Sequence, residues 1–115
     1  NTLCHVEIES ADLDKAQAFY EGVFGWIFKS FMGGQMRVFG VGDSHIGGLM
    51  LVDKVNPGSS PSLWFKVDSL EAAVARVVAH GGAVVSPSSP VPGVGFSCQV
   101  KDPEGNLVGL VEYTD

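Results

Sequence analysis

The chain has 115 residues, a length that organises about one hydrophobic core and excludes two independent catalytic domains. Hydrophobic residues make up 45% of it and charged residues 17%, which indicates a globular protein able to bury a core. It carries 7 Lys and Arg against 13 Asp and Glu, a net charge of −6 with no basic cluster, which excludes nucleic acid and anionic membranes as expected partners.

The sequence also bears on membrane insertion and on disulfide formation. No stretch approaches the ~20 apolar residues of a transmembrane helix, and no export leader is visible, so a soluble cytoplasmic protein is expected. Cys4 and Cys98 lie far apart and form no C-x-x-C pair. We therefore expect two reduced core thiols rather than a disulfide framework or a thiolate zinc site.

The sequence repeats itself with an offset of 57 residues. This offset places Leu13 on Leu70 and Gly25 on Gly82, within the same succession of strand, helix and glycine. Such a repeat indicates one supersecondary unit used twice. The two modules cover about residues 1–55 and 62–115, with a linker over 56–61.

The first module begins with a strand over Cys4–Ile8, where alternation places Cys4, Val6 and Ile8 on one face. A helix is predicted to start near Asp12 or Asp14, whose carboxylates can cap it, and to end at Gly25. Three strand-like segments then complete the module: Trp26–Phe31, Gln35–Val41 and His45–Val52.

The second module follows the same order. A strand over Pro61–Phe65 precedes a helix that starts near Asp68 or Ser69 and ends in a left-handed cap at Gly81-Gly82. The strands after it are predicted over Ala83–Ser86, Phe96–Val100 and Leu107–Tyr113. Each module is thus β-α-β-β-β, and the expected α+β fold is a half-open barrel of two curled sheets with the helices outside.

From end to end the chain resembles the vicinal oxygen chelate superfamily, which includes glyoxalase I, extradiol dioxygenases and bleomycin-resistance proteins. The resemblance rests on the order and spacing of motifs along the whole length. The motifs are His5–Ile8, Asp12–Ala16, Phe19-Tyr20, Phe24–Trp26, Phe65–Asp68, Gly81-Gly82 and Asp102–Val108. It implies the same fold, a cavity on the inner face of the sheets and a homodimer.

The resemblance also implies where a metal would be held. Metal-dependent members bind a divalent ion with four inward His, Gln or Glu side chains, and those positions fall on His5, Gly48, Ser62 and Gly109. Only His5 supplies a donor of that kind, whereas such ions need about three or more protein donors. We therefore predict a degenerate metal site and no cofactor. A divalent metal in a rearranged site of His5, Glu7 and His45 is the alternative, while Glu112 has the wrong parity and should point away.

The cavity itself is expected to be apolar and enlarged. Alternation places Ile46 and Met50 beside Gly48, and Leu107 and Val111 beside Gly109. The residues predicted to bind ligand are His5, Gly48, Met50, Ser62, Trp64, Phe96 and Gly109.

Three features keep two interpretations each. Trp64, with Lys66 beyond it, is either a platform for a ligand or a plug of the barrel. The segment Pro90–Phe96 is either a lip over the cavity or an ordinary connection. His5 is either a hydrogen-bonded relic or a group that contacts the ligand as acid or base.

Two functions of different classes follow from these observations. The first is a small-molecule-binding protein that takes an apolar or amphipathic ligand, with the acidic charge suited to a cationic one. The second is an enzyme, a glyoxalase-like lyase or isomerase or a dioxygenase, that uses His5 as its catalytic residue with an atypical or absent metal. A subunit or fused module of a larger assembly is a third interpretation.

Overall fold

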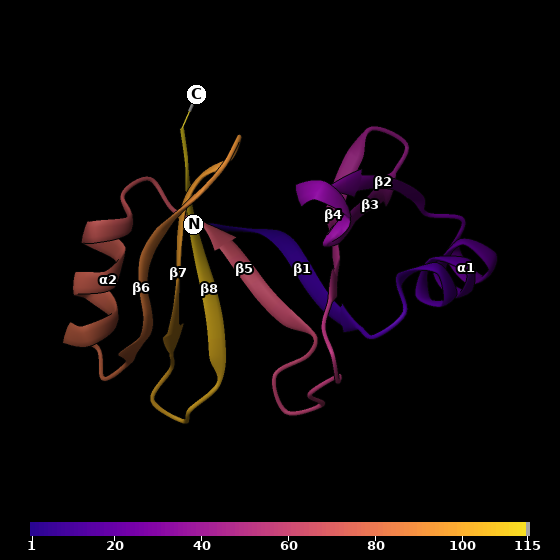
Figure 1. Ribbon diagram of the computed structural model, residues 1–115. Helices are drawn as coiled ribbons and strands as arrows, with labels where there is room; N and C mark the ends of the chain where they lie inside the picture. The colour runs from indigo at the N-terminus through magenta and orange to yellow at the C-terminus, as the bar shows by residue number, and fades with distance from the viewer. Residues whose placement is uncertain (115) are drawn as a thin grey trace. The chain divides into compact units, whose positions relative to one another are not determined.

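The computed structural model describes residues 1–114 and divides into two compact units. The amino-terminal unit is Cys4–Ser62, and the carboxy-terminal unit is Leu63–Asp115 together with Asn1–Leu3. Figure 1 shows the elements of both units in chain order. Neither of the two helices within residues 1–114 is long and apolar enough to cross a bilayer.

The amino-terminal unit has one helix and a four-stranded ladder. Its elements are β1 (Thr2–Ser10), α1 (Leu13–Phe24), β2 (Ile27–Phe31), the 3-10 turn η1 (Met32–Gly34), β3 (Met36–Val41) and β4 (Ser44–Leu51). The strand order is β2-β3-β4-β1, in which β1 runs parallel to β4 and the other pairs are antiparallel.

Helix α1 begins and ends where its sequence signals place it. The Asp12 carboxylate accepts a hydrogen bond from the Lys15 amide, and Gly25 ends the helix with a left-handed φ of 69°. Leu13 is buried under the helix against Phe39 and Leu49. Both predicted helix boundaries of this module are confirmed.

The carboxy-terminal unit repeats this arrangement. Its elements are β5 (Ser62–Lys66), α2 (Leu70–Ala79), β6 (Ala83–Val91), β7 (Gly95–Lys101) and β8 (Leu107–Tyr113). The strand order is β5-β8-β7-β6, with β5 parallel to β8. Figure 1 shows α2 alongside the strands of this unit.

Helix α2 is capped at both ends by local hydrogen bonds. The Ser69 hydroxyl accepts from the Ala72 amide at the start. At the other end Gly81 and Gly82 donate their amides to the carbonyls of Val78 and Val77, the pairing of a Schellman motif. The helix covers a buried core of Val67, Leu70, Ala73, Cys98, Val100 and Leu110.

The two modules match in register as well as in order. In the parallel ladders Glu7 lies opposite Gly48 and Trp64 lies opposite Gly109. The helix caps Asp12 and Ser69 are also separated by the predicted offset. The α+β class and the repeated β-α-β-β-β order are confirmed, while the half-open barrel stays a prediction.

The predicted strand Ala83–Ser86 was too short, because β6 continues to Val91. Pro87 and Pro90 argue against a strand in the sequence, because proline cannot donate a hydrogen bond to a ladder. At the end of the strand order β6 pairs with β7 alone, and an edge strand tolerates residues that cannot donate to a ladder. The segment Pro90–Phe96 closes this hairpin, since Val91 pairs with Gly95 and the Val94 amide bonds to the Val91 carbonyl.

A β-bulge in β4 also departs from the expected alternation. Phe39 pairs with Gly47 but the next residue, Gly40, pairs with His45, so Ile46 is the extra residue of the pair. Ile46 packs against the buried cluster beneath α1. The expectation that Ile46 lies beside Gly48 was therefore wrong.

Candidate functional site

The candidate site lies on the face of the amino-terminal sheet opposite α1. Leu49 and Phe39 point into the core beneath the helix, so by alternation Gly48, Met50 and Met36 lie on the other face. Ile8 belongs to the same core, which places His5 and Glu7 on that other face too. The bulge at Ile46 shifts the alternation of β4 by one residue, so His45 also lies on the face opposite α1.

Two imidazoles are hydrogen-bonded on this face. His5 Nδ1 and His45 Nε2 lie 2.9 Å apart, with ring centroids separated by 5.1 Å and ring planes inclined by 19°. Glu7 Oε1 lies 3.8 Å from the other nitrogen of His5, Nε2. A carboxylate there favours a proton on Nε2, which makes Nδ1 the acceptor of the His45 Nε2–H. The three side chains thus form a chain of carboxylate, imidazole and imidazole.

His5 and Glu7 are partly buried, whereas His45 is exposed. The side chains of His5 and Glu7 are 17% and 19% exposed. Desolvation lowers the pKa of His45 below its ordinary value, and a positive charge on His5, when that ring is protonated, acts in the same direction. His45 is therefore neutral at neutral pH and has a lone pair for a proton or a ligand.

The bulge that brings His45 to His5 depends on two glycines. A Cβ on Gly40 would overlap the carbonyl oxygen of Ser44, and one on Gly47 would overlap that of Val6. Only glycine allows these backbones to approach so closely. The pair Gly40 and Gly47 was the one sequence signal for the bulge, and alternation alone could not reveal it.

The space over Gly48 is filled. A Cβ placed there would lie 3.0 Å from Met36 Sδ and 3.4 Å from His5 Cε1. Met50 lies opposite Met36 in the ladder and is partly buried. The thioether of Met36 therefore covers the position where the resemblance implies an acid.

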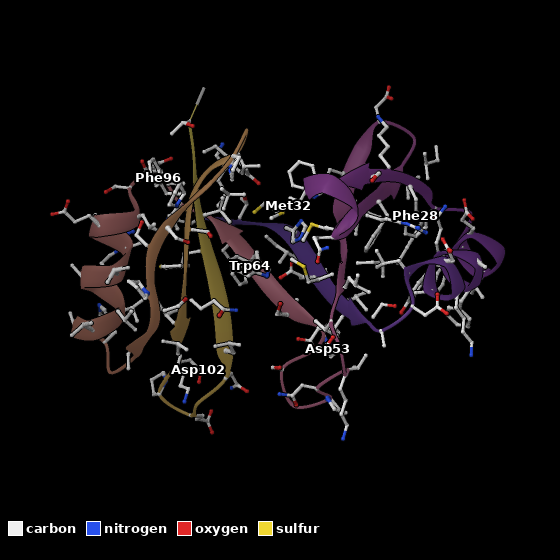
Figure 2. All side chains as sticks on the ribbon, viewed as in Figure 1. Phe28, Met32, Asp53, Trp64, Phe96 and Asp102 are labelled. Atoms are coloured by element: carbon white, nitrogen blue, oxygen red, sulfur yellow. The ribbon has the colours of Figure 1, made fainter. Side chains whose placement is uncertain are left out.

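The space over Gly109 is filled as well. A Cβ on this residue would overlap the six-membered ring of the Trp64 indole, which projects from β5 (Figure 2). The space directly over each of the two glycines is therefore occupied by a neighbouring side chain of the same unit. The sequence shows that both acidic positions carry glycine, but it does not show that Met36 and Trp64 occupy the space over them.

The remaining predicted residues, from β5 and β7, divide between the two faces of the sheet β5-β8-β7-β6. By alternation Ser62, which is buried, and Lys66 share the face of Trp64. The Lys66 ammonium lies 5.9 Å from the ring centroid of Tyr113, within reach of a cation–π contact. Lys66 thus has a neighbour within its own unit.

Phe96 lies on the other face of this sheet, beside α2 (Figure 2). It pairs with Glu112, whose carboxylate accepts a 2.7 Å hydrogen bond from the Leu70 amide at the start of α2. Glu112 thus points away from Gly109, as predicted. Phe96, 42% exposed, lines a groove of about 480 Å³ that also includes Cys98. Burial raises the pKa of the Cys98 thiol, which forms no disulfide.

The side chains present do not fit the divalent ion that the resemblance implies. Two of its four positions, Gly48 and Gly109, carry no donor, and the space for one is taken by Met36 and Trp64. Ser62 offers a neutral hydroxyl, a weak ligand. Across residues 1–114, no three His, Cys, Asp or Glu side chains are grouped so that they could hold a metal ion.

Comparisons with known proteins agree with this fold. The sequence profile "Glyoxalase/Bleomycin resistance protein/Dioxygenase superfamily" matches residues 2–110. The protein named "Putative glyoxylase CFP32" from Mycobacterium tuberculosis (strain CDC 1551 / Oshkosh) is 33% identical over 117 residues. That match covers 96% of this chain but 44% of the relative, so the chain spans less than half of the relative's length.

Solved structures show the same architecture. Hypothetical protein BH1468 from Bacillus halodurans C-125 has a TM-score of 0.77 at 16% identity, covering 99% of this chain and 95% of that one. Methylmalonyl-CoA epimerase from Mycobacterium tuberculosis has a TM-score of 0.73 at 23% identity, covering 99% and 89%. At these identities the likeness is one of fold.

Proposed function

Because the chain belongs to the glyoxalase/bleomycin resistance protein/dioxygenase superfamily, we propose that it is a small-molecule-binding member with a degenerate metal site. One observation carries the proposal: Gly48 and Gly109 stand at the two acidic positions, and Met36 and Trp64 fill the space over them. A divalent ion that activates vicinal oxygens needs anionic or imidazole donors there. Glycines covered by apolar groups remove that chemistry and leave surfaces suited to an apolar body.

The proposed ligand is apolar or amphipathic. Within the amino-terminal unit Met50 provides apolar contact area and His5 provides a hydrogen-bonding group; within the carboxy-terminal unit the indole of Trp64 provides apolar contact area. The net charge of −6 favours a ligand with a cationic end. The predicted ligand contacts, the half-open barrel and a cytoplasmic location are parts of this proposal.

Metal content and ligand binding test the proposal together. Elemental analysis of the purified protein is expected to find no stoichiometric Mg, Mn, Fe or Zn. A thermal-shift screen of cationic amphipathic compounds is expected to raise the melting temperature. A stoichiometric divalent ion that is lost in His5→Ala together with an activity would overturn it.

A second candidate function is enzymatic, and the chain Glu7–His5–His45 favours it. Glu7 lies beside Nε2 of His5, and Nδ1 of His5 accepts a hydrogen bond from Nε2 of His45. The other nitrogen of His45, Nδ1, is then left as a proton acceptor. Two similar proteins carry the names "Putative glyoxylase CFP32" and methylmalonyl-CoA epimerase. For this candidate we infer a reaction that moves a proton on a carbon next to a carbonyl.

Turnover assays separate the two candidates. The panel comprises α-ketoaldehyde adducts, catechols, epoxides and acyl thioesters. The enzymatic candidate requires turnover that His45→Gln reduces strongly and His80→Gln leaves unchanged. Absence of turnover across the panel, with ligand binding intact, leaves the binding function alone.

We also propose that the chain forms a homodimer, as the resemblance implies. The relative CFP32 has more than twice the length of this chain, which is consistent with a functional assembly larger than one such domain. Sedimentation velocity at micromolar concentration is expected to give the mass of a dimer. A strict monomer at that concentration would contradict this part of the proposal.

A further inference from the structure

Beyond this proposed function, we propose that His5, His45 and Met36 form a binding site for a soft monovalent metal ion, Cu(I). The site lies on the face of the amino-terminal sheet opposite α1. Its three donors come from β1, β4 and β3. It differs from the divalent site of the family, which would use His5 with donors at Gly48, Ser62 and Gly109.

The two imidazoles already converge as ligands of one ion do. His5 Nδ1 and His45 Nε2 lie 2.9 Å apart. Two nitrogens that each bind an ion at ~2 Å lie at most ~4 Å from one another. An ion can therefore replace the shared proton after a small rotation of the rings.

Glu7 lies near the nitrogen of His5 that does not contact His45. Its Oε1 lies 3.8 Å from Nε2 of His5, the nitrogen that faces away from His45. Histidines that bind metals commonly donate their second ring N–H to a carboxylate, which fixes the tautomer and makes the ligating nitrogen more basic. At 3.8 Å Glu7 lies within ion-pair distance of His5, so its carboxylate balances part of the ion's charge.

Met36 decides which ion the site prefers. Its Sδ and the Cε1 of His5 both lie over Gly48, at 3.0 and 3.4 Å from the position of a Cβ there. The sulfur and this edge of the imidazole therefore lie on the same face, over Gly48, and Met36 as a residue is 5% exposed. Thioethers are soft ligands that select Cu(I), whereas Mg²⁺ and Mn²⁺ prefer carboxylate and carbonyl oxygens.

The glycine at position 48 permits this arrangement. An acidic side chain there would occupy the place of the thioether, and it would supply a hard oxygen donor instead. The same substitution that removes a ligand of the family's divalent ion therefore brings a soft ligand next to His5. Cu(I) accepts a low coordination number, so two imidazoles and one thioether suffice.

Anaerobic titration with Cu(I) against a chromophoric chelator measures the affinity directly. The wild-type protein is expected to bind one ion, and both His45→Ala and Met36→Leu should weaken binding by ~10-fold or more. Glu7→Gln should weaken it less. The matched control is His80→Ala, which removes the third histidine of the chain at the end of α2 and should leave the affinity unchanged.

Far-UV circular dichroism of each variant separates loss of ligand from loss of fold. Ag(I), a redox-inert substitute, provides a second readout by shifting the imidazole resonances of His5 and His45 and the methyl resonance of Met36 in the wild-type protein. Equal Cu(I) affinity in the wild type and a folded His45→Ala variant would overturn the proposal. So would Zn²⁺ binding tighter than Cu(I), or Ag(I) shifts confined to other residues.

Discussion

Gly109→Ala tests whether the indole of Trp64 really closes the acidic position of the carboxy-terminal unit. The new Cβ would overlap the six-membered ring of the indole, so the ring or the strand must shift. Overpacking of this kind typically costs ~1–3 kcal/mol. Gly109 has no positive φ, so no backbone strain adds to the cost. For a domain of this size the loss corresponds to a melting temperature lower by roughly 3–12 °C.

Gly48→Ala is the matched control, because it adds the same methyl group at the equivalent position. Its nearest neighbour would be the Met36 sulfur at 3.0 Å, the end of a flexible side chain that can move aside. Gly48 also lacks a positive φ. We expect its free energy of unfolding to change by less than ~1 kcal/mol.

Urea denaturation of both variants, with and without Trp64→Ala, measures these effects. If the indole causes the cost, Gly109→Ala should destabilise the Trp64→Ala background much less than the wild type, a coupling that a double-mutant cycle reports. The slope of the unfolding transition should stay constant. Equal losses for the two glycine variants, or additive effects of Gly109→Ala and Trp64→Ala, would refute the reasoning.

Three further predictions concern the caps, the histidine pair and the bulge. Ser69→Ala removes the cap of α2 and should lower the free energy of unfolding by ~1 kcal/mol in urea denaturation, whereas Ser88→Ala on the exposed β6 should change it by less than ~0.5 kcal/mol. Desolvation lowers the pKa of folded His45 below its ordinary value of 6.5, so the unfolded chain binds more protons and stability should fall as the pH drops through that value. Urea denaturation at pH values on either side of 6.5 should show this loss of stability in the wild type but not in His45→Asn. The same pH dependence in both proteins would contradict the prediction. Gly47→Ala places a Cβ against the Val6 carbonyl and should cost more than ~2 kcal/mol, with loss of amide-exchange protection along β1 and β4; retained protection would show that the close approach is unnecessary.

The helices could be predicted because their signals are local. Asp12 and Ser69 cap the backbone within one turn of themselves, and Gly25 takes a conformation that other residues avoid. The repeat extended these signals, since a cap in one module located the cap in the other. The order of elements therefore followed from short-range chemistry and periodicity.

The details that decide the candidate site are not local. The bulge at Ile46 shifts the parity of β4 and turns His45 toward His5, although strict alternation placed Ile46 there. The indole of Trp64 lies over Gly109 because β5 pairs with β8, two strands that are far apart in the sequence. Periodicity assigns residues to faces, but it does not say which side chain fills the space that a missing one leaves.

The melting temperature of the purified protein with a cationic amphipathic ligand, measured with and without excess EDTA, tests the central claim most directly. Saturation at 100 times the dissociation constant adds ~2.7 kcal/mol to the free energy of unfolding. A degenerate metal site predicts the same ligand-induced rise in both conditions. A rise that EDTA abolishes and that added Mg²⁺, Mn²⁺ or Zn²⁺ restores would contradict it.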